Sequence, residues 1–182
     1  MAVSLSVVVP VKDEAENVAP LAREIARALS EEDTPEIIFV DDGSTDGTAE
    51  ALAALKIELP QLRVIRHGRN AGQSRAIRTG MRAARADIVA TLDGDGQNDP
   101  ADIPALVAQL RVGNAKLGMV GGVRANRQDR LSRRLASTLA NAFRRAMLGD
   151  TATDTGCGIK AIRRDVYLSL PYFDHQHRFL IN

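Results

Sequence analysis

Apolar and polar positions follow two alternating patterns along the chain. In one, Val18, Leu21, Ile25 and Leu29 recur every three or four positions, as on one face of a helix. In the other, short runs are rich in β-branched residues, and we predict strands there, at residues 5–11, 36–42, 62–67, 87–93 and 117–123. Strands that alternate with helices are typical of an α/β domain whose mainly parallel, Rossmann-like sheet is flanked by helices.

Polar clusters follow the first four predicted strands. They read "VKDEAEN", "DDGSTDGT", "HGRNAGQS" and "DGDGQNDP". Ligands of open parallel sheets bind outside the carboxyl ends of the strands. The expected ligand site therefore lies among these clusters.

Length and composition indicate a single domain. The chain has 182 residues, 45% of them hydrophobic, and no linker rich in proline, glycine or serine divides it. A formal net charge of +1 and an aromatic content of 3% argue against a nucleic-acid binder. We expect one domain over residues 1–182 and no nucleic-acid partner.

The cysteine content and the N-terminal residues bear on the compartment. Cys157 is the single cysteine and cannot form an internal disulfide. No histidine stands beside it in its motif, so a packing role is favoured over that of a nucleophile. The first residues lack the basic region and cleavage site of a secretory leader, and no run approaches the roughly 18 apolar residues of a spanning helix. These features predict a cytoplasmic location.

The stretch "DGDGQNDP" carries the strongest candidate chemistry. In an extended chain, residues i and i+2 face the same way, so the carboxylates of Asp93 and Asp95 could both bind one ligand. Gly94 and Gly96 have no side chains and would let that ligand approach the backbone closely. Mg²⁺ and Mn²⁺ prefer such oxygen ligands and share them with phosphates, which indicates a site for a metal diphosphate. The simpler alternative is a turn with side-chain hydrogen bonds to its own backbone.

Three common motifs can be excluded. Counted from Asp93 as an EF-hand loop, position six is Asn98 instead of glycine and position twelve is Pro104 instead of glutamate. Neither a G-x-x-x-x-G-K-[ST] phosphate loop nor a G-x-G-x-x-G dinucleotide turn occurs. A diphosphate must be held in another way.

Residues 123–148 form a basic, amphipathic segment. Asp129 is its only acid, and an apolar stripe follows a strict spacing of four at Leu131, Leu135, Leu139, Phe143 and Met147. Its seven arginines are residues 124, 127, 130, 133, 134, 144 and 145. The segment is either a docked helix with a solvated arginine face or a site for a phosphate or an anionic membrane surface.

Taken in order, four motifs resemble a known family. With "VVVPVKDEAENV", "VDDGSTDGT", "NAGQSRAIRTGMRAARADIVATLDGDGQNDP" and "DTGCGIKAIRR", the chain resembles the inverting glycosyltransferase family 2, which has the GT-A fold. It is most similar to the dolichol-phosphate mannosyltransferase branch, whose bacterial members load sugars onto polyprenyl phosphate. Lys12 departs from the pattern, because the branch usually has an aromatic residue there.

The resemblance implies a donor site for a UDP- or GDP-linked sugar. Pro10, Lys12, Glu14 and Asp42 would border the nucleoside, although Lys12 and Glu14 could instead be a solvated loop pair. The diphosphate and its Mg²⁺ or Mn²⁺ would be met by Asp93, Asp95 and Gln97. The nucleotide-binding part would cover about residues 1–100.

Other polar residues near these motifs have simpler interpretations. We expect Asp46 to make a turn and cap a helix, and Asp99 to cap a helix whose first turn contains Pro100. We interpret His67 as a surface residue and not as a base.

The acceptor part would cover about residues 101–182. The resemblance nominates Arg124, Arg133 and Arg134 as a cradle for the phosphate of a polyprenyl acceptor. Such an acceptor is already anionic and needs no strong base. A saccharide or other hydroxyl acceptor would need one, and Asp154 is then the candidate, unless it orients a loop or pairs with Lys160 or an arginine.

Two further functions remain as alternatives. The first is a nucleotide-sugar binding domain without turnover, against which the acids at 42, 93 and 95 argue. The second is a sugar nucleotidyltransferase, whose glycine-rich basic N-terminal loop is missing here.

The last residues, "YFDHQHRFLIN", stop where the family continues into further structure, often with membrane helices. We therefore expect a chain truncated at its C-terminus and a protein that is peripheral at the inner face of the cytoplasmic membrane.

Overall fold

The computed structural model describes residues 2–114, 117–122 and 157–171. Its elements follow one another as β1 (Leu5–Val11), α1 (Val18–Ala28), β2 (Pro35–Asp41), α2 (Thr48–Glu58), β3 (Leu62–Arg66), α3 (Gln73–Ala83), β4 (Ile88–Thr91), the 3₁₀ helix η1 (Pro100–Asp102), α4 (Ile103–Val112), β5 (Met119–Gly121), β6 (Lys160–Arg163) and α6 (Arg164–Ser169). Among the described residues, no helix is both long and apolar enough to cross a membrane.

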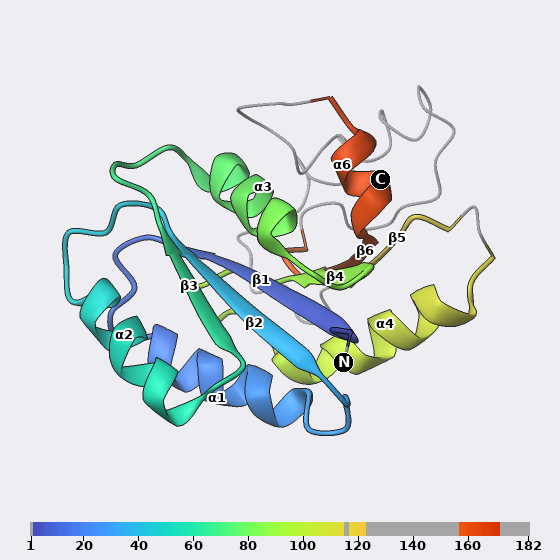
Figure 1. Cartoon of the computed structure of the whole chain (residues 1–182), viewed down its shortest axis with the longest axis horizontal. Helices are drawn as coiled ribbons and strands as arrows, with labels where there is room; N and C mark the ends of the chain where they lie inside the picture. Colours follow the sequence, from blue (N-terminus) through green and yellow to red (C-terminus); the bar gives the residue numbers. More distant parts are fainter. Residues whose placement is uncertain (1, 115–116, 123–156, 172–182) are drawn as a thin grey trace, which may run out of the picture.

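The described strands form one mixed sheet in the order β3-β2-β1-β4-β6-β5 (Figure 1). Strands β3, β2, β1 and β4 pair in parallel, as the sequence predicted. Of the strand predicted at 117–123, the described residues 117–122 form a strand over β5. Strand β6, which was not predicted, runs antiparallel to both β4 and β5. The α/β prediction is confirmed, with a mixed border at one side of the sheet.

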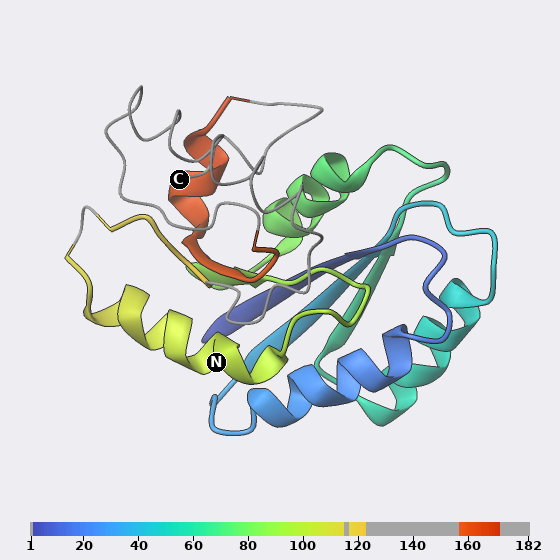
Figure 2. The same ribbon diagram turned by 180° about the vertical axis from the view of Figure 1, so that it is seen from behind.

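Helices cover both faces of the sheet (Figures 1 and 2). One buried cluster joins α1, α2 and α4 to the strand residues Val7, Val9 and Phe39. A second cluster joins α3 and α6 to the alternate residues Val8 and Val40. Because successive strand side chains point to opposite faces, this alternation buries β1 completely between two helical layers.

The parallel order decides where the polar clusters meet. The carboxyl ends of β1, β2, β3 and β4 lie at one edge of the sheet, so the loops 12–17, 42–47, 67–72 and 92–99 all leave from that edge. This is the position at which parallel sheets bind ligands.

Candidate functional site

Asp42 is the organising carboxylate of this edge. It follows β2, is 4% exposed, and its Oδ1 accepts hydrogen bonds from Nδ1 of His67 at 2.7 Å and the backbone N–H of Ala71 at 2.9 Å. Its Oδ2 accepts the backbone N–H of Gly72 at 2.7 Å. Burial by itself would raise the pKa of Asp42, but these donors hold it below its ordinary value, so the group is a carboxylate at neutral pH.

His67 lies between Asp42 and the helix behind it. The prediction of a surface residue is wrong, because the ring is only 16% exposed and Nε2 lies 2.9 Å from Oγ1 of Thr79 on α3. When Nδ1–H donates to Asp42, Nε2 of the neutral ring accepts from the Thr79 hydroxyl. The loop after β3 is thus fastened to the end of β2 and to α3 together.

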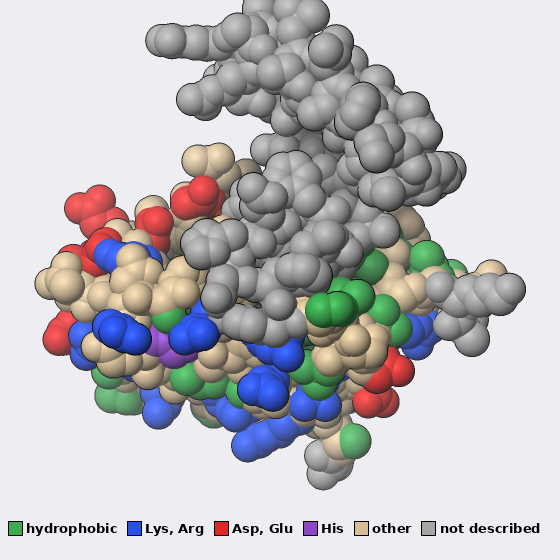
Figure 3. Space-filling model, turned by 90° about the horizontal axis from the view of Figure 1, so that it is seen from above, with side chains coloured by type: hydrophobic (Ala, Val, Ile, Leu, Met, Phe, Trp, Pro, Cys, Tyr) green, Lys and Arg blue, Asp and Glu red, His purple; other side chains and the backbone are tan. Residues whose placement is uncertain are grey.

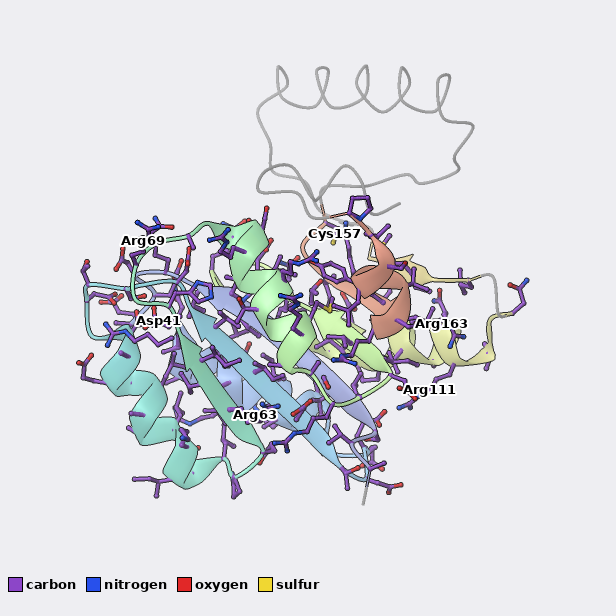
Figure 4. All side chains as sticks on the ribbon, turned by 45° about the horizontal axis from the view of Figure 1, so that its top comes forward. Asp41, Arg63, Arg69, Arg111, Cys157 and Arg163 are labelled. Carbon is purple, nitrogen blue, oxygen red and sulfur yellow. The ribbon has the colours of Figure 1, made fainter. Side chains whose placement is uncertain are left out.

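The loops after β1 and β2 are joined by a second set of hydrogen bonds. Asp13 has a φ of 55°; its N–H donates to Oγ of Ser44 at 2.9 Å and its Oδ1 accepts the Thr45 N–H at 2.8 Å. Asp41 is completely buried and fixes the same loop, since its Oδ1 accepts the Ser44 N–H at 2.8 Å. Figure 4 shows Asp41 and Arg69 at the same end of the sheet.

The alternative interpretation, in which Lys12 and Glu14 form a solvated pair, is wrong, because each side chain has another partner. Lys12 forms an ion pair with its neighbour Asp13, and the pKa of Lys12 is raised by that partner. The Glu14 carboxylate accepts from the side chain of Asn17 at 2.6 Å. Both side chains lie on the loop that follows β1, beside the Asp42 region.

The turn predicted at Asp46 and the helix cap predicted at Asp99 are confirmed, whereas Asp46 is not the N-cap of α2, a position that Gly47 occupies. Asp46 Oδ1 accepts the Thr48 N–H at 2.9 Å at the start of α2. Asp99 accepts the Ala101 N–H at 2.9 Å, with Pro100 in the first position of η1.

Asp93, Asp95 and Gln97 lie on the loop after β4. Oδ1 of Asp93 accepts a hydrogen bond of 2.7 Å from Nε2 of Gln73, the first residue of α3. Oδ1 of Asp95 accepts the Gln97 N–H at 3.1 Å, and both of these side chains are exposed. The turn-type hydrogen bond is therefore present, and it leaves the Asp95 carboxylate at the surface of the loop.

Glycines allow two close approaches to this loop. A Cβ on Gly94 would lie 2.7 Å from the Pro10 carbonyl oxygen and 2.5 Å from Cγ1 of Val11, so the neighbour that requires glycine here is β1, whereas the sequence suggested a ligand. A Cβ on Gly158 would overlap Oδ2 of Asp93 and lie 2.6 Å from its Cγ. Gly158 and Gln73 thus hold Asp93 from two sides.

The oxygen ligands of this loop fit a divalent cation that is shared with a diphosphate. Within residues 2–114, 117–122 and 157–171, no three His, Cys, Asp or Glu side chains come together as a metal-binding group. Mg²⁺ usually takes one or two carboxylates and completes its coordination with phosphate oxygens and water. Asp93 and Asp95 match that need, whereas a cage made only of protein ligands does not form in this part of the chain.

Several candidates from the sequence lie outside the described residues. They are the basic segment 123–148 with Arg124, Arg133 and Arg134, and the possible base Asp154. Cys157 is described: it is 3% exposed within the larger buried cluster, which confirms its packing role.

The sequence placed His67 and Gln73 in the cluster "HGRNAGQS" at the expected ligand site, but it did not predict their contacts with Asp42 and Asp93, and it gave Gly158 no role. The contact of His67 with Asp42 follows from the strand register, which pairs Asp41 with Arg66 and so makes the next residues, Asp42 and His67, neighbours. Gln73 and Gly158 lie inside motifs that were recognised, but their contacts with Asp93 depend on how α3 and β6 pack around β4.

The chain is similar to known glycosyltransferases. The profile described as glycosyl transferase family 2 matches residues 6–170. The dodecaprenyl-phosphate galacturonate synthase of Rhizobium johnstonii is 38% identical over 179 residues, which are 97% of this chain and 52% of that protein. The undecaprenyl-phosphate 4-deoxy-4-formamido-L-arabinose transferase of Pectobacterium carotovorum is 39% identical over 180 residues, 97% of this chain and 54% of that protein. The chain therefore spans about half the length of these relatives.

Solved structures agree with the fold. Glucosyl-3-phosphoglycerate synthase from Mycobacterium tuberculosis, in complex with Mn²⁺ and UDP-glucose, superposes with a TM-score of 0.72 at 26% identity. The superposition covers 92% of this chain and 58% of that one.

Proposed function

The chain belongs to glycosyltransferase family 2, and from this premise we propose that it transfers a sugar from a nucleoside-diphosphate sugar to a polyprenyl phosphate, with inversion at the anomeric carbon. The observation that carries the proposal is the meeting of the Asp42 loop and the Asp93–Asp95 loop at one edge of a GT-A type sheet. The polyprenyl-phosphate names of the relatives, at 38% and 39% identity over 97% of the chain, supply the acceptor class.

The donor nucleoside would lie against the loops after β1 and β2, beside Pro10, Lys12, Glu14 and Asp42. Asp42 already accepts three hydrogen bonds from the protein, so its contribution is to hold the loop of residues 67–72 and to offer a remaining lone pair to a base or ribose. A uracil nucleotide is the first choice, because the similar synthase structure holds UDP-glucose. A GDP-linked sugar is the alternative.

The diphosphate would lie at the loop after β4, with Mg²⁺ or Mn²⁺ held by Asp95 and assisted by Asp93 and Gln97. When bound, the cation neutralises the charge that develops on the leaving diphosphate. Gln73 keeps the Asp93 carboxylate in place through the 2.7 Å hydrogen bond. Gly158 leaves the space that this carboxylate occupies.

The acceptor would enter from the part of the chain after residue 100. A lipid phosphate is anionic near neutral pH and attacks without proton removal, so the protein must supply positive charge and not a base. Arginine binds phosphate oxygens in a bidentate manner, and we assign this cradle to Arg124, Arg133 and Arg134. Such an enzyme works at the inner face of the cytoplasmic membrane, where it meets its lipid.

A hydroxyl acceptor with Asp154 as the base is the second candidate. It is favoured by the likeness to glucosyl-3-phosphoglycerate synthase, which has been crystallised with phosphoglyceric acid at 27% identity and a TM-score of 0.71. A nucleotide-sugar binding domain without turnover is a third and weaker candidate.

Arginine variants test the acceptor. We expect Arg124→Ala and Arg134→Ala to raise the apparent KM for polyprenyl phosphate or to abolish transfer, while UDP binding persists. Arg144→Ala is the matched control, because Arg144 comes ten residues after Arg134 and, in the helix that the sequence predicts, would lie about 15 Å beyond it. Transfer at the parental rate by both variants would favour the Asp154 mechanism instead.

A further inference from the structure

The net charge of +1 conceals a strong separation of charge along the chain. Residues 59–86 contain seven arginines and no aspartate or glutamate. The preceding residues 13–58 contain 13 acids and only three lysines or arginines, Arg23, Arg27 and Lys56. The basic stretch covers β3 and α3, whereas the acidic one covers β2 and the helices α1 and α2, which pack on the other face of the sheet.

The seven arginines are distributed from one end of the domain to the other. Arg63 and Arg69 lie at opposite ends of β3 (Figure 4). Three more follow at intervals of three and four residues on α3, which places them on one side of that helix: Arg75, Arg78 and Arg82. Arg85 comes just after the helix, which ends at Ala83. Figure 3 shows lysine and arginine side chains gathered along the lower rim of the described surface, with most acids at the upper left.

Two acids from β2 form ion pairs with the two arginines of β3. Arg63 pairs with Glu36 at 2.7 Å and Arg66 with Asp41 at 3.2 Å. In the described part of the chain, no carboxylate is within ion-pair distance of Arg69, Arg82 or Arg85, and all three side chains are exposed. The positive charges of these three side chains are therefore available to bind an external anion.

The backbone under Arg82 and Arg85 is fixed independently of their side chains. The Arg82 carbonyl accepts from the guanidinium of Arg164 at 3.0 Å. The Arg85 N–H donates to the buried carboxylate of Glu36 at 2.6 Å. These arginines thus stand on a rigid support, and Arg82 lies about 14 Å along α3 from Gln73 and the donor site.

We propose that the side of the domain formed by β3 and α3, the arginine face, docks on an anionic phospholipid bilayer and orients the enzyme there. The inference rests on the proposed polyprenyl-phosphate acceptor, which lies in such a membrane. An anionic surface attracts the arginine face and repels the acidic α1–α2 side, so the domain has one favoured orientation. Because α3 begins at Gln73, which contacts Asp93, docking along this helix brings lipid head groups to the border of the donor site.

Vesicle binding of paired charge variants tests the proposal. Arg82→Glu/Arg85→Glu changes the net charge by the same amount as the control Arg27→Glu/Lys56→Glu, whose exposed side chains lie on α1 and α2. Binding is measured by cosedimentation with phosphatidylcholine vesicles with and without phosphatidylglycerol. Each basic residue near an anionic surface strengthens binding about fivefold, so loss of two arginines weakens binding about thirtyfold, and the added negative charges weaken it further. We therefore expect Arg82→Glu/Arg85→Glu to bind phosphatidylglycerol vesicles more than about thirtyfold more weakly than the parent, and the control to bind them nearly as the parent does.

Three outcomes would overturn the proposal. They are equal binding to neutral vesicles, equal losses in the two double variants, and parental binding that does not weaken as salt is raised. If the protein does not bind vesicles but associates with itself, and if salt and the Arg82→Glu/Arg85→Glu change both abolish this association, then the arginine face binds a second copy of the chain instead of a membrane. UDP binding in solution, measured on the same proteins, is expected to be unchanged, so failure of the docking face and failure of the donor site are distinguishable.

Discussion

Gly158→Ala tests how closely the motif "DTGCGIK" is fitted to the donor site. The added Cβ would lie 2.6 Å from Cγ of Asp93 and 3.0 Å from Nδ2 of Asn98. Carbon atoms pack at about 3.5–4.0 Å, so the Asp93 carboxylate must move by about 1 Å. That movement also lengthens the hydrogen bond from Gln73.

The expected loss concerns function and not stability. The atoms in conflict belong to the end of a half-buried side chain, which can rotate, so the midpoint of thermal unfolding should stay close to the parental value. A displacement of about 1 Å at a reacting centre costs on the order of a hundredfold in rate. We therefore expect kcat/KM for sugar transfer to fall by about that factor, with weaker binding of UDP in the presence of Mn²⁺.

Calorimetric titration of UDP with and without Mn²⁺, together with steady-state transfer, measures both effects. Gly121→Ala is the matched control, because a Cβ there meets no atom of the described residues within 4 Å. If Gly158→Ala kept the parental rate and the parental metal-dependent affinity for UDP, Asp93 would have no positional role and the argument from its two neighbours would fail.

Three further predictions concern single carboxylates. Asp95→Ala should make UDP affinity the same with Mn²⁺ as with a chelator; a persisting metal effect in calorimetry would remove Asp95 from the metal site. Asp42→Ala should weaken UDP more than pyrophosphate, since it releases the loop of residues 67–72 beside the nucleoside; equal losses would assign Asp42 to the phosphate side. Burial tends to raise the pKa of Glu36, but hydrogen bonds from Ser6, the Arg85 N–H and Arg63 hold it below its ordinary value. The ionised Glu36 therefore stabilises the folded state above the unfolded pKa of about 4.3, and this contribution is lost as the pH falls through the folded pKa. The free energy of unfolding, measured in urea, should therefore fall less steeply between about pH 5 and pH 3 in Glu36→Gln than in the parent. An identical dependence on pH in the two proteins would contradict this linkage.

The sequence predicted the central strands well because their signals are local. The run from Leu5 to Val11 is apolar, β-branched and bounded by polar residues, and β1 has these same bounds. Strand β6 lacks such a signal: Lys160 and Arg163 flank only two apolar residues, and Lys160 is buried. It is a strand because β4 and β5 pair with it on both sides.

The site shows the same division between local and tertiary information. The hydrogen bonds of Asp46 and Asp99 span two residues and were predictable from turn chemistry. The partners of Asp42 are 25 to 30 residues away, and Gln73 is 20 residues from Asp93, so only the packed sheet brings them together. The arginine face was overlooked because a net charge averages over the two sides of the domain.

The fate of a labelled sugar tests the proposed function most directly. The 182-residue chain is incubated with a UDP-sugar labelled in the sugar, Mn²⁺, polyprenyl phosphate in anionic vesicles, and an equal amount of a saccharide acceptor, and the label is then partitioned between organic solvent and water. We predict that the label enters the organic phase as a polyprenyl-phosphate sugar of inverted anomeric configuration, only when the lipid phosphate is present. Label that appears in the saccharide, and does so equally without the lipid, would contradict the polyprenyl-phosphate acceptor.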